Sequence, residues 1–234
     1  MSSAVIAGGT GLVGSNILST LISHPAFTTT SAFTRRKLPI ESTKVTSLEN
    51  KDSESWPALF PRSPVPSILF SALGTTRAQA GSVANQRKID LDLSLALAKE
   101  AKEAGVQTYV LISTAGANAA SSMAYPQMKG ELEESVKKLG FKHTIILKPG
   151  LIVGTREDSR PPEAVLRSMA NFMGSVSGGR LKDFWAQDAD VIARAAVNAA
   201  YQTINGNKDE GLWLLTQTDI VRLGRTEWTV PHGT

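Results

Sequence analysis

The 234-residue sequence contains no cysteine. This absence excludes a disulfide framework, a cysteine nucleophile, a thiolate zinc site and an iron-sulfur cluster. Histidine is scarce as well, because His24, His143 and His232 are the only three and lie in unrelated segments without metal-ligand spacing. A serine-hydrolase elbow is also missing. The sequence therefore predicts no metal centre and no hydrolase triad.

The sequence also lacks long apolar runs and blocks of like charge. No stretch reaches the roughly 18 apolar residues of a spanning helix, so we expect a soluble or peripheral protein. The first apolar run, Ala4–Ala7, begins almost at the initiator methionine, so we expect no presequence. The formal net charge of +4 is spread along the chain, which suits an anionic cofactor without requiring nucleic acid.

What the sequence does contain is a regular alternation of short apolar runs and longer periodic segments. This pattern predicts an α/β fold: a Rossmann-type, doubly wound, mostly parallel sheet with helices on both faces. We expect one domain over residues 1–234, with a cofactor-binding core at 1–150 and a substrate-side part at 151–234. The predicted strands are Ala4–Ala7, Thr30–Phe33, Ser67–Leu73, Thr108–Ile112, His143–Leu147 and Leu212–Leu215. The predicted helices are Gly11–Ile22, Asn85–Ala104, Pro126–Leu139, Glu163–Met173 and Asp190–Gln202.

Three other segments lack a clear strand or helix signal. Pro57–Pro66 holds four prolines and is expected to form a loop. The tail after Gly224 has no period, so we expect it to be loosely held. Apolar side chains cluster late in the chain, where they could form a lid over a substrate, although ordinary core packing is the simpler interpretation. These are Met169, Phe172, Met173, Phe184 and Trp185.

A glycine-rich loop joins the first strand to the first helix. Residues 8–14 read Gly-Gly-Thr-Gly-Leu-Val-Gly, which is the dinucleotide fingerprint in its expected context. The early glycines permit a tight turn and a close backbone approach to a pyrophosphate, and the helix N-terminus supplies free N–H groups. The residues expected to contact the cofactor are Gly8, Thr10, Gly11, Leu12, Val13 and Gly14.

The second strand is followed by three consecutive cations. Dinucleotide folds that prefer NAD place an acidic residue here, whereas a 2′-phosphate is bound by cations. Thr34 is followed by Arg35, Arg36 and Lys37, and guanidinium groups make forked contacts with phosphate. A solvated basic turn would look the same, but its place after the strand favours NADP(H), with Arg35 and Arg36 as phosphate ligands.

A tyrosine and a lysine stand four residues apart at the start of a predicted helix. The spacing places Tyr125 and Lys129 on one helical face, where the ammonium is expected to lower the pKa of the phenol. Such a tyrosine can act as a general acid or base. Ser113, twelve residues upstream, ends a predicted strand at the sheet edge where ligands bind, and its hydroxyl could hold a substrate carbonyl. A surface helical pair would show the same spacing, so the combination with Ser113 and the glycine loop carries the prediction.

With these motifs, the sequence resembles the atypical short-chain dehydrogenases/reductases. It is most similar to fungal, mitochondrial outer-membrane-associated relatives of the Tat-interacting protein oxidoreductase. The resemblance spans roughly residues 4–220 and includes four further segments. These are residues 72–77 (Ala-Leu-Gly-Thr-Thr-Arg), 112–117 (Ile-Ser-Thr-Ala-Gly-Ala), 125–131 and 148–150 (Lys-Pro-Gly).

The resemblance implies roles for individual residues. Ser113, Tyr125 and Lys129 fall on the catalytic triad. Leu73, Gly74 and Thr75 would lie beside the adenosine and ribose, and Pro149 and Gly150 beside the nicotinamide, with Tyr125 and Lys129 also touching the cofactor. Two departures are visible: Lys148 stands where relatives have arginine, and residues 72–75 replace an Asn-Asn-Ala-Gly stretch, which puts an asparagine-assisted proton relay in doubt.

The resemblance further implies an NADP(H)-dependent oxidoreductase that reduces a small apolar aldehyde or ketone. It would be a peripheral protein on the cytosolic face of the mitochondrial outer membrane. The alternative is an NADP(H)-binding regulator or scaffold without turnover, because fold does not dictate function. The oligomeric state stays open, since either long helix could pair with a second copy.

Overall fold

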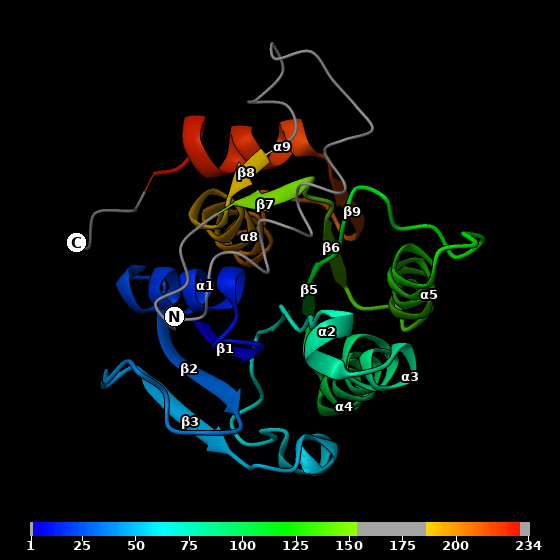
Figure 1. Cartoon of the computed structure of the whole chain (residues 1–234). Coiled ribbons are helices and arrows are strands. Elements are labelled where there is room, and N and C mark those ends of the chain that lie inside the picture. Colours follow the sequence, from blue (N-terminus) through cyan, green and yellow to red (C-terminus); the bar gives the residue numbers. More distant parts are fainter. Residues whose placement is uncertain (1, 154–185, 230–234) are drawn as a thin grey trace.

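The protein is built on one seven-stranded sheet (Figure 1). The computed structural model describes residues 2–153 and 186–229. All strand pairs in the sheet are parallel, in the order β3-β2-β1-β4-β5-β6-β9. The strands are β1 (Ser2–Ala7), β2 (Phe27–Thr34), β3 (Val45–Glu49), β4 (Ile68–Ser71), β5 (Thr108–Ile112), β6 (His143–Leu147) and β9 (Gly211–Leu215). The chain winds outward from β1 in both directions, so the predicted doubly wound Rossmann-type fold is confirmed.

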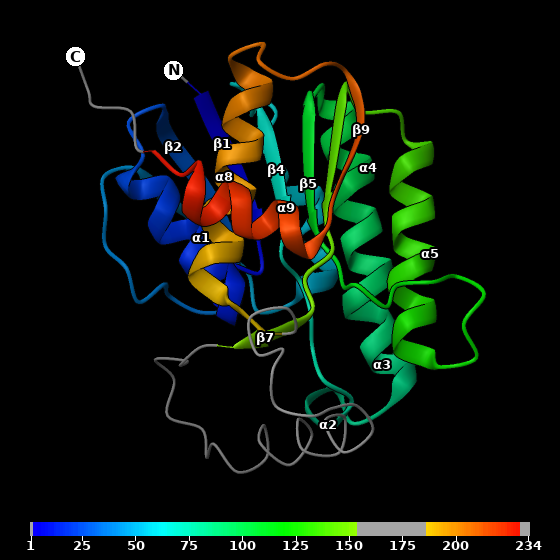
Figure 2. The ribbon, with the colours of Figure 1, turned by 90° about the horizontal axis from the view of Figure 1, so that it is seen from above.

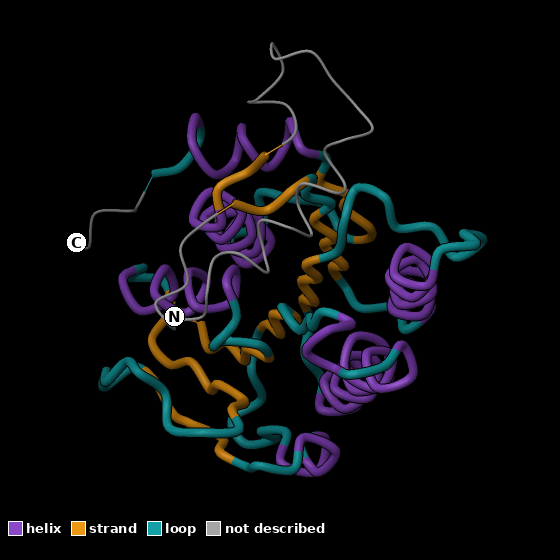
Figure 3. Tube along the Cα trace, viewed as in Figure 1, coloured by secondary structure: helices purple, strands orange, loops and turns teal. Residues whose placement is uncertain are grey.

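Helices cover both faces of this sheet (Figures 2 and 3). On one side lie α1 (Leu12–Ser23) and α8 (Ala189–Ile204), and on the other α3 (Val83–Arg87), α4 (Ser94–Ala104) and α5 (Ala124–Lys138). Side chains of β1 alternate between the two layers: Ile6 packs with the α1 and α8 cluster, and Val5 with the α4 and α5 cluster. A strand covered on both faces carries a near-continuous apolar run, such as Ala4–Ala7 of β1, which explains the short apolar runs in the sequence.

The six predicted strands all exist, and β5 and β6 have the predicted bounds. The prediction missed β3, which lies at one edge of the sheet and pairs with β2. Its residues are half-buried or exposed, and polar Thr46 and Ser47 occupy its centre. An edge strand with a wetted surface therefore carries no apolar run to detect.

The predicted helix Asn85–Ala104 is interrupted. Between α3 and α4 the chain forms a π-helical segment, η3 (Lys88–Leu93). A single π turn widens a helix locally and is often found at functional sites. Here it contains Asp90, whose side chain is fully buried.

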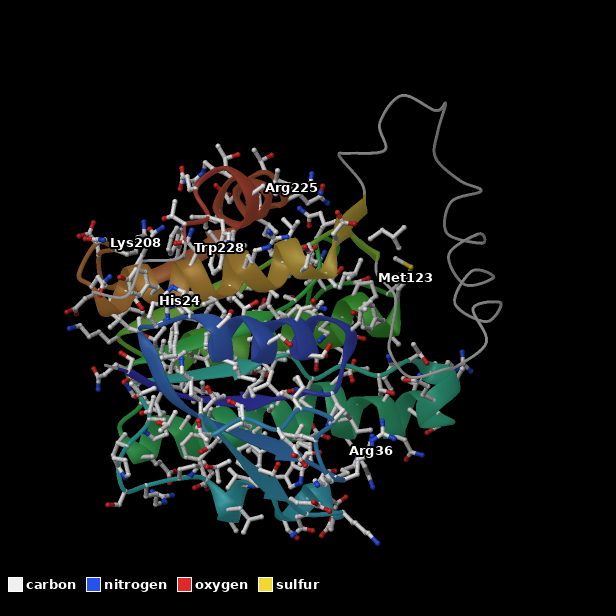
Figure 4. All side chains as sticks on the ribbon, turned by 90° about the vertical axis from the view of Figure 1, so that its left-hand side faces the viewer. His24, Arg36, Met123, Lys208, Arg225 and Trp228 are labelled. Atoms are coloured by element: carbon white, nitrogen blue, oxygen red, sulfur yellow. The ribbon has the colours of Figure 1, made fainter. Side chains whose placement is uncertain are left out.

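The C-terminal tail is held more firmly than predicted. The segments α9 (Gln217–Val221) and η4 (Arg222–Thr226) pack against α8. The side-chain amide of Asn198 donates hydrogen bonds to the carbonyls of Leu223 at 2.9 Å and Glu227 at 3.2 Å. Trp228 packs on the core beside His24 (Figure 4). The expectation of a loose tail is therefore wrong as far as Trp228, and residues 230–234 lie outside the described part.

The remaining segments are short. The proline-rich loop 57–66 is irregular apart from a 3₁₀ turn, η2 (Pro57–Leu59), preceded by η1 (Ser53–Ser55), and α2 (Arg77–Ala80) follows β4. A separate parallel pair joins β7 (Leu151–Val153) to β8 (Ala186–Asp188). The predicted helix Glu163–Met173 and the five candidate lid residues lie outside the described residues.

Candidate active site

The glycine loop forms the tight turn expected of it. Gly8 has a φ of +91°, and a Cβ there would lie 2.4 Å from the carbonyl oxygen of Ala72. A Cβ on Gly14 would lie 2.0 Å from the carbonyl oxygen of Gly8. The first turn of α1 contains no acidic residue and no side-chain cap, so its N–H groups remain suited to an anion. Close packing thus brings the start of α1 to the carboxyl end of β1.

The loop after β4 lies directly beside the glycine loop, because β4 is the other neighbour of β1. This is the point where the strand order reverses, at which dinucleotides bind in open α/β sheets. Buried side chains hold Thr75 on both sides: its N–H donates to Asp90 at 2.8 Å, and its carbonyl accepts from Gln86 at 2.8 Å. Gly74 is exposed, with open space where a Cβ would stand.

The predicted phosphate ligands follow β2, which pairs with β1 on the side opposite to β4. Arg35, Arg36 and Lys37 are all exposed, and Lys37 pairs with Glu41 at 3.0 Å. The hydroxyl of Thr34 hydrogen-bonds to the backbone of Arg36 and shapes this turn. Figure 4 shows Arg36 at the same end of the molecule as Met123, which precedes α5. The cations therefore lie just beyond the carboxyl end of β2, beside the carboxyl end of β1, where the glycine loop begins.

The three predicted catalytic residues lie on β5 and α5. Ser113 directly follows β5, is 4% exposed, and donates its backbone N–H to the carbonyl of Leu147 at 2.8 Å. Tyr125 stands in the first turn of α5 with 42% of its surface exposed, whereas Lys129, one turn later, is buried. Gly130, next to Lys129, lets α5 pack closely on the loop that precedes it, since a Cβ there would lie 2.1 Å from the backbone nitrogen of Ala119.

Two buried carboxylates, absent from the sequence-based prediction, connect these residues. The ammonium of Lys129 donates to the carbonyl of Leu73 at 3.3 Å and interacts electrostatically with Asp90 and Glu133. Asp90 also acts on Tyr125, and Glu133 accepts a hydrogen bond from the hydroxyl of Ser113. Among the described residues, the Tyr125 hydroxyl forms no hydrogen bond with Ser113 or Lys129. The carboxylates, and not direct contacts, link the three.

The electrostatics differ from the expectation for a Tyr-x-x-x-Lys pair. Partial burial of the side chain and the negative charge of Asp90 raise the pKa of Tyr125 to about 12. The prediction that Lys129 lowers the pKa of this phenol is therefore wrong for the protein without cofactor, because Lys129 faces the carboxylates. Burial lowers the pKa of Lys129, although Asp90 and Glu133 both act to raise it. Burial also raises the pKa of Asp90.

The turn after β6 lies next to this group. The carbonyl of Pro149 accepts a hydrogen bond from the N–H of Ala115 at 2.8 Å, which places the predicted Pro149 and Gly150 beside the segment that follows Ser113. The side chain of Lys148 reaches Glu133, with Nζ 3.2 Å from Oε2. The lysine that departs from the family pattern is thus the ion-pair partner of the buried glutamate.

A sequence signal for Glu133 existed. It stands four residues after Lys129, which extends the Tyr-x-x-x-Lys spacing by one more helical turn on the same face. Asp90 had no such signal, because it comes from η3 on the neighbouring helix. Among residues 2–153 and 186–229, no group of His, Asp or Glu side chains is placed to hold a metal ion.

Comparison with known proteins identifies the family. The chain is 49% identical to "Protein fmp52, mitochondrial" of Aspergillus fumigatus over 232 residues, covering 96% of this chain and 99% of that protein. It belongs to the fmp52 family. Protein fmp52-2 of Aspergillus terreus is 42% identical over 231 residues, covering 97% of this chain and 99% of that protein. The profile of the HIM1 family matches residues 63–176.

Solved structures share the fold of this fmp52 protein at low sequence identity. A short chain dehydrogenase family protein from Francisella tularensis superposes with a TM-score of 0.67 at 13% identity, covering 94% of this chain and 98% of that one. MoeE5 in complex with UDP-glucose and NAD gives 0.66 at 15% identity, covering 92% and 75%. In the described part of the chain, no helix is both long and apolar enough to cross a bilayer.

Proposed function

We propose that this fmp52 protein is an NADP(H)-dependent oxidoreductase that interconverts a small apolar aldehyde or ketone with its alcohol. The observation that carries the proposal is the gathering of Ser113, Tyr125 and Lys129 at the carboxyl edge of the sheet beside the glycine loop. A structural turn and a surface helical pair would not need a buried lysine set between two buried carboxylates.

The residues present fit a dinucleotide. The glycine loop brings bare backbone to the uncapped start of α1, where a pyrophosphate is stabilised by N–H groups and by the helix dipole. MoeE5, which shares the fold, is described in complex with NAD. In this chain residues 34–37 carry three cations and no acid, which favours a 2′-phosphate on Arg35 and Arg36 and hence NADP(H).

Each catalytic side chain then has a task. The bound cofactor supplies the hydride. Tyr125, with a pKa of about 12, is a neutral phenol at pH 7 and serves as the general acid that protonates the reacting oxygen. Ser113 would hydrogen-bond to the substrate oxygen, and Lys129 would hold the cofactor ribose. Pro149 and Gly150 would flank the nicotinamide.

The cofactor is tested by fluorescence titration with NADPH and NADH. We expect NADPH to bind more tightly, and Arg35→Ala/Arg36→Ala to remove that preference. Loss of two charge-assisted contacts worth about 1.5–3 kcal/mol each would weaken NADPH binding by at least about 100-fold. Lys37→Ala is the matched control, because Lys37 is also exposed and its ammonium is held by Glu41. Failure of both nucleotides to bind would refute the proposed oxidoreductase function.

Turnover is tested separately with a panel of apolar aldehydes and ketones and the variant Tyr125→Phe. The variant should keep NADPH affinity and lose turnover, because only the phenolic hydroxyl is removed. Cofactor binding without turnover of any carbonyl compound in the wild type would instead indicate the regulator or scaffold.

For the location we propose peripheral attachment to the cytosolic face of the mitochondrial outer membrane. The relatives named mitochondrial and the resemblance to outer-membrane-associated reductases support this. Protease treatment of intact mitochondria should degrade the protein, and alkaline carbonate should release it. Protection from protease until the outer membrane is ruptured would contradict the proposal.

A further inference from the structure

The hydroxyl of Ser113 is directed at a carboxylate. Its Oγ donates to Oε1 of Glu133, and both residues are 4% exposed. The second oxygen of Glu133, Oε2, accepts from the ammonium of Lys148 at 3.2 Å. Each oxygen of this buried carboxylate therefore has its own donor, and the two donors approach from different elements, one after β5 and one after β6.

This arrangement determines which hydrogen bonds Ser113 can still form. An ionised carboxylate only accepts, and a hydroxyl has a single hydrogen and two lone pairs. While the Ser113 hydroxyl donates its hydrogen to Glu133, its oxygen can offer a ligand only a lone pair and can therefore only accept a hydrogen bond. A ketone or aldehyde oxygen also offers only lone pairs, so it cannot bond to Ser113 in this state. An alcohol can, because its hydroxyl supplies the hydrogen.

We propose that Glu133 is a positioning residue that fixes Ser113 as a hydrogen-bond acceptor, so that the site binds the alcohol in preference to the matching carbonyl compound. The inference rests on the proposed function. It specifies that, of the alcohol and the matching carbonyl compound, the resting site recognises the alcohol. It also revises the role of Ser113, which holds a hydroxyl and does not donate to a carbonyl.

The variant Glu133→Gln should reverse this polarity. Lys148 only donates, so it will face the amide oxygen of the new side chain, which turns the amide NH₂ toward Ser113. Ser113 then accepts from the amide, and its own hydrogen is released for a ligand. The change conserves shape, and Lys148 is 24% exposed, so its charge can be solvated.

The experiment compares two ligands of equal shape in complexes that cannot react. Dissociation constants are measured by saturation-transfer NMR for cyclohexanol with saturating NADPH and for cyclohexanone with saturating NADP⁺. The wild type should bind cyclohexanol. In Glu133→Gln, cyclohexanol should bind about 3- to 10-fold more weakly and cyclohexanone more tightly by a similar factor, the worth of one hydrogen bond. A purely structural role would weaken both ligands together.

Two matched variants isolate the effect. Lys148→Gln breaks the same ion pair but leaves Ser113 bonded to Glu133, so it should not reverse the preference. Glu131→Gln removes another ion pair of α5, with Arg87 at 2.6 Å, and should leave both constants unchanged. If Glu133→Gln does not fold, Ser113→Ala takes its place and should abolish the preference for cyclohexanol.

Three results would overturn the inference: parallel weakening of both ligands in Glu133→Gln, the same reversal in Lys148→Gln, or no binding of cyclohexanol to the wild type with cofactor bound. Cofactor binding is recorded before either ligand is added. A wild type that binds no cofactor refutes the proposed function, and this inference falls with it.

Discussion

Replacing Asp90 by asparagine should lower the pKa of Tyr125. That pKa is about 12, compared with an ordinary value of 10.0, and burial is a larger cause than the charge of Asp90. Less than half of the difference therefore belongs to the charge, so Asp90→Asn should lower the pKa by up to about one, to between about 11 and 12. Lys129 is not among the causes of the raised pKa of Tyr125, which are burial and the charge of Asp90.

The assay is NMR of protein labelled with ¹³C at the tyrosine Cζ. The chain has three tyrosines, and Tyr125→Phe identifies the resonance. At pH 11, about a tenth of Tyr125 should be phenolate in the wild type and up to about half in the variant; circular dichroism verifies that both remain folded. Thr75 can still donate to the asparagine oxygen, so its loop stays in place. An unchanged or higher pKa in Asp90→Asn would refute the coupling between Asp90 and Tyr125.

Two further predictions concern the scaffold. Gly14→Ala places a Cβ 2.0 Å from the Gly8 oxygen. The variant should lower the free energy of unfolding in urea by about 1–3 kcal/mol and weaken NADPH binding at least about tenfold. Wild-type values for both would contradict the close packing. His24 is buried and its pKa is lowered, first by burial and then by the charge of Lys44, so the unfolded chain binds the proton more tightly and this contribution to stability is lost as pH falls below about 6.5. His24→Asn should flatten the fall in unfolding free energy between pH 7 and pH 5, and an unchanged slope would assign it to other groups.

Continuous apolar runs made the sheet predictable from sequence. In a parallel sheet covered on both faces, inner strands tend to carry near-continuous apolar runs, and β5 and β6, whose residues are all buried, contain the runs Tyr109–Ile112 and Ile145–Leu147. The same reasoning fails for β3, because an edge strand pairs on one side and can be polar. It also fails for the tail, where Asn198 anchors two backbone carbonyls that leave no trace in hydrophobic periodicity.

The interruption of the long helix escaped prediction for a related reason. Residues 85–104 carry apolar side chains at helical spacing, and a π turn shifts that spacing by only one residue. The shift turns Asp90 into the interior, where its carboxylate accepts a hydrogen bond from the backbone N–H of Thr75. An acidic residue on an amphipathic helix is ordinarily read as solvated, so burial of this carboxylate depends on the tertiary structure alone.

The direction of the Tyr125 pKa shows what helical spacing can and cannot establish. Spacing of four residues brings Tyr125 and Lys129 to one face of α5, but a flexible ammonium goes to the strongest acceptors within reach. Here the ammonium donates to the carbonyl of Leu73, and the charges of Asp90 on η3 and Glu133 on the next turn of α5 act on it electrostatically. Before a cofactor binds, the lysine is thus engaged by the carboxylates and the tyrosine keeps its proton. The protonated phenol is the form that the proposed carbonyl reduction would consume, and a bound ribose would have to compete with the carbonyl of Leu73 for Lys129.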